Sequence, residues 1–143
     1  DTFYPDIADI WVEDMRYPEI AELTCMNLFQ YMPCASEKVF HWMADEGEYF
    51  QFCGYMLMTR LLMKGLELNE RAENEFLDQA MVAIQGESAM VRRAASTALR
   101  KYASQRGENA RKLQKILRPL AGSDRLEVII LLEEIKLDAE SLH

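Results

Sequence analysis

The chain contains little glycine and proline and no long apolar run, and each shortage excludes a class of protein. Of 143 residues, 6 are Gly and 4 are Pro, and no stretch shows the sustained alternation of polar and apolar residues that predicts a β-strand. No apolar segment approaches the roughly 20 residues that cross a bilayer, and the N-terminus lacks the basic and apolar regions of a signal peptide. We therefore expect a cytoplasmic protein without a membrane partner.

Common catalytic and ligand-binding motifs are also missing. The sequence has no Gly-rich phosphate loop, no nucleophile elbow, no His-Glu-x-x-His motif and no Ser/His/Asp set. Its cysteines, Cys25, Cys34 and Cys53, are widely spaced among apolar residues and form no Cys-x-x-Cys pair. We expect them to be buried reduced thiols, and we expect neither a metal site nor another cofactor.

The residues that are abundant, Ala, Leu, Met, Glu and Lys, indicate helix throughout. Pro18 is typical of a first helical turn, and Ser36, Asn69, Ser88 and Ser123 are candidate N-caps. Together with the glycines these signals predict eight helices, at 5–14, 17–32, 36–45, 48–65, 69–85, 88–105, 108–117 and 124–139.

The predicted helices fall into pairs. The second members begin near 17, 48, 88 and 124, a spacing of roughly 30 to 40 residues that is typical of two-helix repeats such as HEAT and armadillo. We predict an all-α fold, an α-α superhelix in which antiparallel helix pairs stack as a solenoid; a compact bundle is the alternative. Residues 1–143 then form one HEAT-like repeat domain, and the start at Asp1 suggests a fragment of a longer chain.

Charge is strongly segregated along the sequence. Residues 88–125 carry ten basic side chains and two carboxylates, Glu108 and Asp124, whereas the whole chain has a net charge of −8. The segments before and after are correspondingly acidic. One part of the molecule could therefore face a polyanion while the whole stays soluble.

The predicted helix 88–105 presents its charges away from its apolar stripe. Arg93 and Arg100 lie two turns apart on one face, and Arg92 and Lys101 flank them. These four residues are the candidate contacts to a DNA backbone, which would be salt-dependent and independent of sequence. Basic residues of the next helix, Arg111, Lys112, Lys115 and Arg118, are expected to extend this surface. The alternative is a solvated face neutralised by acidic neighbouring helices.

Aromatic residues cluster around the turn that follows the helix at 36–45. Trp42 and Tyr49 are candidates to stack on a base or sugar in a groove. We prefer the alternative that these rings set the packing angle of a helical hairpin, because the helix that follows is apolar for several turns.

Two carboxylates on one face of the helix at 17–32, Glu19 and Glu22, are weak catalytic candidates. A buried carboxylate beside apolar groups could act as a base or stabilise a developing cation. The preferred interpretation is that first-turn glutamates complement the helix dipole.

Two stretches of the sequence resemble a known family. The segment from Val91 to Ala103, with Ala98-Leu99-Arg100 and Tyr102, resembles the late-repeat signature of the HEAT-like DNA alkylation repair family, the alkylpurine DNA glycosylases. The segment from Trp42 to Arg60 resembles the preceding repeat. The resemblance covers about residues 5–105, and it implies an α-solenoid that cradles damaged duplex DNA and hydrolyses the N-glycosidic bond of alkylated bases.

The chain departs from that family at the positions that matter for catalysis. Thr97 stands where the family has Trp, and Gln51 and Phe52 stand where it has two arginines. The region matching the family's catalytic Asp contains Glu19 and Glu22 instead. We therefore predict a divergent member that binds double-stranded DNA through its backbone, with weak or no glycosylase activity. The alternative, with a protein as partner, is a HEAT-repeat interaction scaffold.

Overall fold

The described part of the chain is entirely helical. The computed structural model describes residues 9, 12–13, 31 and 35–141, and in these residues there are six α-helices and no strand. The helices are α3 (Ala35–Met43), α4 (Glu48–Met63), α5 (Glu70–Ala83), α6 (Ala89–Gln105), α7 (Gly107–Leu117) and α8 (Leu126–Ser141), with a 3-10 turn η2 (Arg118–Leu120) after α7. The all-α prediction is confirmed for these residues.

The predicted helix boundaries agree with the observed ones within a few residues. Asn69 caps α5, because its side chain accepts a hydrogen bond from the backbone N–H of Ala72 at 2.8 Å. Ser88 caps α6 in the same way, through Val91. Ser36 is not a cap, because α3 already begins at Ala35. The predicted helices 5–14 and 17–32 fall almost wholly outside the described residues.

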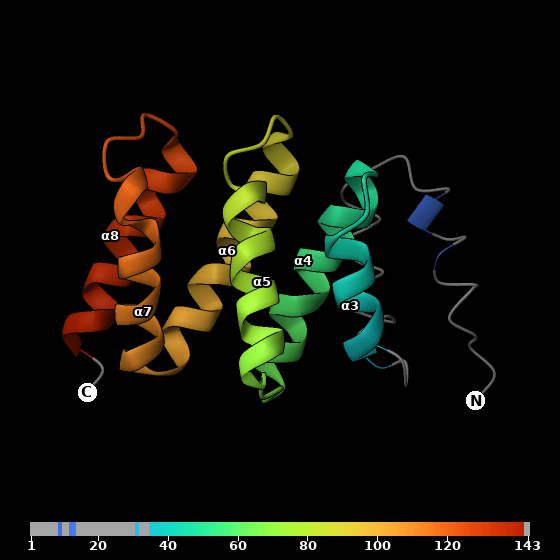
Figure 1. The fold of residues 1–143 in the computed structure, drawn as a ribbon, viewed down its shortest axis with the longest axis horizontal. Helices are drawn as coiled ribbons and strands as arrows, with labels where there is room; N and C mark the ends of the chain where they lie inside the picture. The colour runs from blue at the N-terminus through green and yellow to red at the C-terminus, as the bar shows by residue number, and fades with distance from the viewer. Residues whose placement is uncertain (1–8, 10–11, 14–30, 32–34, 142–143) are drawn as a thin grey trace.

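The helices form a row of antiparallel hairpins in two layers (Figure 1). The first members of the pairs, α3, α5 and α7, run in one direction in the layer nearer the viewer, and the second members, α4, α6 and α8, return behind them. Contacts follow this order: α4 packs against α3 and α6, and α6 also packs against α5, α7 and α8. Each short connection therefore joins one layer to the other.

The core lies between the two layers and is densest around α4. Cys53, Tyr55 and Leu57 of this helix are at most 1% exposed, and the burial of Cys53 agrees with the prediction for that cysteine. Gly54 lets α3 approach α4 closely, since a Cβ at this position would lie 2.7 Å from the backbone nitrogen of Met43. Cys25 and Cys34 lie outside the described residues.

None of the helices in the described part of the chain is both long and apolar enough to cross a membrane.

Candidate nucleic-acid interface

The central helix of the candidate interface is α6, which carries the four predicted DNA contacts. Its buried stripe consists of Val91, Ala94, Ala95, Ala98, Leu99, Tyr102 and Ala103. This stripe faces the neighbouring helices. The apolar stripe predicted for this helix is therefore confirmed.

Arg92 is largely buried and is held at the joint between α6 and α8. Its Nε donates to Glu127 of α8 at 3.3 Å, and its Nη1 donates to the carbonyl oxygens of Gly86 and Glu87 at 3.0 and 2.9 Å. Only 15% of its side chain is exposed. This guanidinium therefore links α8 to the turn that precedes α6.

Arg100 makes the corresponding contact two turns later. Its Nε donates to Glu134 at 2.9 Å, and its Nη1 donates to Asp138. About a third of the side chain is exposed, 32%. The carboxylates of α8 therefore neutralise Arg92 and Arg100. At these two of the four predicted positions, the structure agrees with the alternative in which acidic neighbouring helices neutralise the basic side chains.

Arg93 and Lys101 differ from these two arginines. Arg93 is exposed and Lys101 is half-buried, and within the described residues neither forms an ion pair. Thr97 and Ser104 lie beside them on the outward side, and their hydroxyls donate to carbonyl oxygens of α6 itself. Arg93 and Lys101 on the outward side of α6 are therefore available to contact a ligand. Arg100 lies at the edge of this side.

The basic residues of α7 do not continue this surface. Lys112 forms an ion pair with Glu73 of α5 at 2.7 Å. Arg111, Lys115 and Arg118 are exposed, but α7 belongs to the other layer (Figure 1). A run of charge that is continuous in sequence is thus divided between two sides of the molecule, because α6 and α7 form a hairpin.

Trp42 is a core residue. It is 2% exposed, its Nε1–H donates to Asp9 at 2.7 Å, and its ring meets Phe50 edge-on at 6.4 Å between centroids. Burial raises the pKa of Asp9, but hydrogen bonds from Lys38 and Trp42 outweigh this effect and leave the pKa below its ordinary value. Tyr49 is half-buried and packs against the same core. These contacts agree with the alternative in which the rings of Trp42 and Tyr49 set the packing of a helical hairpin.

The catalytic candidates Glu19 and Glu22 lie outside the described residues, so nothing is said of their positions. In the described part of the chain, no three His, Cys, Asp or Glu side chains lie close enough together to hold a metal ion.

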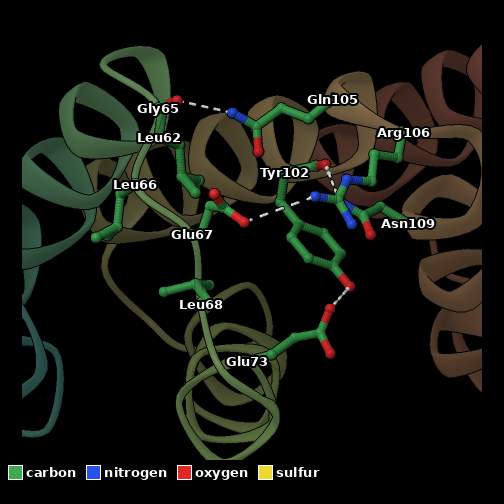
Figure 2. Close-up of a pocket in the computed structure, with 10 residues that line it drawn as sticks. All are labelled: Leu62, Gly65, Leu66, Glu67, Leu68, Glu73, Tyr102, Gln105, Arg106 and Asn109. Carbon is green, nitrogen blue, oxygen red and sulfur yellow. Dashed lines mark hydrogen bonds and ion pairs between the residues drawn. The ribbon is translucent and has the colours of Figure 1, made fainter.

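A pocket of about 330 Å³ lies between the α4–α5 connection and the junction of α6 and α7 (Figure 2). The ring of Tyr102 stands at its centre with the hydroxyl directed at the carboxylate of Glu73. Glu73 also accepts from Lys112, and Arg106 lies 4.0 Å from Glu67. The charges around the pocket are thus paired within the protein, which leaves no clear preference for an ionic ligand.

The cluster of Glu73, Tyr102 and Lys112 was not predicted from the sequence. Burial raises the pKa of Glu73, but hydrogen bonds from Lys112 and Tyr102 outweigh it, so the pKa lies below the ordinary 4.5. Burial and the bond to Glu73 raise the pKa of Tyr102. The partners lie 29 and 39 residues apart, and no local sequence signal connects them.

Comparisons with known proteins found no match to this chain, neither among protein-family models nor among curated proteins or solved structures.

Proposed function

We propose that this chain is a HEAT-like domain of the DNA alkylation repair type that binds the backbone of double-stranded DNA. The observation that carries the proposal is the pair of cations, Arg93 and Lys101, on the outward side of α6 without carboxylate partners in the described residues. Such contacts hold phosphates without reading sequence. The stacking of α4, α6 and α8 in one layer supports the superhelical arrangement that the resemblance implies.

The roles of the four predicted residues differ within this proposal. Arg93 and Lys101 bind phosphate directly. Arg92 and Arg100 are positioning residues, because their guanidinium groups fix α8 against α6. With about two direct contacts, affinity is low and the log–log dependence on salt has a slope of roughly −2.

The proposal is tested with a fluorescent duplex that contains an abasic-site analogue, titrated over a salt series. The variant Arg93→Glu with Lys101→Glu removes both free cations and leaves the α6–α8 ion pairs intact. The matched control, Arg71→Glu with Lys115→Glu, makes the same change of net charge at exposed residues of α5 and α7. Loss of binding in the first variant alone is expected. Equal loss in both variants, or no binding of the native chain at low salt, overturns the proposal.

Base release is the further part of the family resemblance, and we propose that it is weak or absent here. The support is the sequence: the positions of the family's two arginines hold Gln51 and Phe52, and Gln51 donates to the carbonyl oxygen of Asp45. Release of methylated purines from an alkylated duplex measures the activity. A rate near that of the uncatalysed reaction is expected, and Glu19→Gln and Glu22→Gln locate the carboxylate if release is faster.

The second candidate function is a protein-interaction scaffold. The same cations could hold an acidic peptide, and four large aliphatic side chains of α8 are exposed. Competition separates the two functions: a polyglutamate peptide that displaces the duplex at an equal concentration of charge favours the scaffold. Displacement only by nucleic acid favours the first proposal.

A further inference from the structure

Carboxylates are scarce on the two central helices of the second layer. The chain has 24 Asp and Glu residues among 143, about one in six, but α4 has only Glu48 and α6 has none. Glu48 lies in the first turn of α4, where it accepts a hydrogen bond from Ser88. The later turns of α4 and the whole of α6 therefore place no negative side chain of their own beside the cations that they carry.

Arg60 is the basic residue of α4, and within the described residues it forms no ion pair. Its Nη1 donates to the sulfur of Met63 at 3.8 Å, and a thioether is a weak acceptor without charge. Met56, Arg60 and Met63 recur at intervals of four and three residues, so they share one side of the helix. All three are partly or fully exposed, so Arg60 lies on the side of α4 that is not used for packing.

Two hydrogen bonds fix the register between α4 and α6, which run in the same direction (Figure 1). Ser88 at the start of α6 donates to Glu48 at the start of α4, 40 positions earlier. Near the other end, Nε2 of Gln105 donates to the carbonyl oxygen of Leu62, 43 positions earlier. Residues of α6 therefore lie level with the residues of α4 that precede them by about 40 positions.

This register sets Arg60 level with Lys101 of α6. The axes of packed helices lie about 8–10 Å apart, whereas Arg93 precedes Lys101 by eight residues, about 12 Å along α6. Both helices belong to the second layer (Figure 1), so their partly exposed sides adjoin. The three cations therefore spread in two directions, along α6 and across to α4, and no carboxylate of either helix lies between them.

We propose that Arg60 is a third contact to the phosphates of the bound duplex, so that the DNA backbone crosses from α6 to α4. This inference rests on the proposed function and deepens it. A guanidinium suits the role because it can bind two phosphate oxygens through parallel hydrogen bonds. A third contact makes the log–log dependence of affinity on salt steeper, from a slope of roughly −2 to one of roughly −3.

The test titrates the fluorescent duplex over the salt series with the native chain, Arg60→Gln and Arg60→Lys. Arg60→Gln should weaken binding about tenfold at low salt and reduce the steepness of the slope by about one. Arg60→Lys keeps the charge and should keep the native slope, which separates a phosphate contact from a loss of packing. The matched control is Arg71→Gln, which removes the same charge from an exposed residue of α5 in the other layer and should bind like the native chain.

Failure of this inference is distinguishable from failure of the proposed function. Equal slopes for the native chain and Arg60→Gln overturn the inference alone when Arg93→Glu with Lys101→Glu still abolishes binding. Equal weakening by Arg71→Gln also overturns it, because the effect then follows net charge and not position. A native chain that does not bind the duplex at low salt overturns the proposed function together with this inference.

Discussion

Helices α4 and α8 have the same length, 16 residues, and are both rich in apolar side chains, but they are buried to different extents. Eight residues of α4 are buried, whereas α8 buries Val128, Leu131 and Ile135 and exposes four large aliphatic residues. Helix α4 packs against α3 and α6, and α8 packs against α7 and α6. However, α8 lies at the end of the row, and no further helix of the described residues follows it (Figure 1). The position of a helix in the stack, and not its composition, decides how much of it is buried.

The largest expected effect follows from removing an aliphatic side chain in each helix. Leu57 of α4 is 0% exposed, so Leu57→Ala should lower the free energy of unfolding by about 2–5 kcal/mol. Leu137→Ala in α8 should cost less than about 0.5 kcal/mol, because this side chain is 63% exposed. Urea denaturation measures both values, and equal costs would show that α8 is as well covered as α4.

The next effect tests the close approach of α3 and α4. Gly54→Ala places a methyl group 2.7 Å from the backbone nitrogen of Met43, and the helices must separate, at about 1–3 kcal/mol. Gly122→Ala is the control, because a Cβ there meets no atom within 4 Å. A Gly54→Ala variant as stable as the native chain would contradict the tight α3–α4 contact.

A smaller effect is expected at the contact between α6 and α8. Arg100→Ala removes contacts to Glu134 and Asp138 and should cost about 1 kcal/mol, because these groups are only partly buried. Arg93→Ala, with no ion pair in the described residues, should cost almost nothing. A double-mutant cycle of Arg100→Ala with Glu134→Ala isolates the coupling energy between the two side chains. A coupling energy of zero would show that this ion pair does not stabilise the contact between α6 and α8.

The smallest effect is a dependence of stability on pH at the Glu73 cluster. The pKa of Glu73 is lower in the folded chain than its ordinary 4.5, so its contribution is present above about pH 4.5 and is lost as pH falls through the folded pKa. The pair with Lys112 is partly exposed, and the expected loss is a few tenths to about 1 kcal/mol. Glu73→Gln should flatten the acid side of the stability profile relative to Glu75→Gln, an exposed control; identical profiles would count against the cluster.

Local sequence signals predicted most of the described fold. The caps at Asn69 and Ser88 and the apolar stripe of α6 depend on interactions within a few residues, so the observed boundaries of α5 and α6 agree with expectation. The candidate site was less predictable. The outward direction of Arg93 follows from helical periodicity alone, but the carboxylates that hold Arg92 and Arg100 lie 34 to 38 residues away.

The sequence by itself determined that the described chain is helical, where its helices begin and end, and which side of each helix is apolar, because these properties depend on neighbours within one or two turns. Only the tertiary structure decided which cations form ion pairs within the chain and which remain available to a ligand. Stacking places Glu127, Glu134 and Asp138 of α8 beside α6, and it leaves the aliphatic side of α8 at the end of the row. Both outcomes depend on which helices become neighbours in space, and local periodicity carries no information about that.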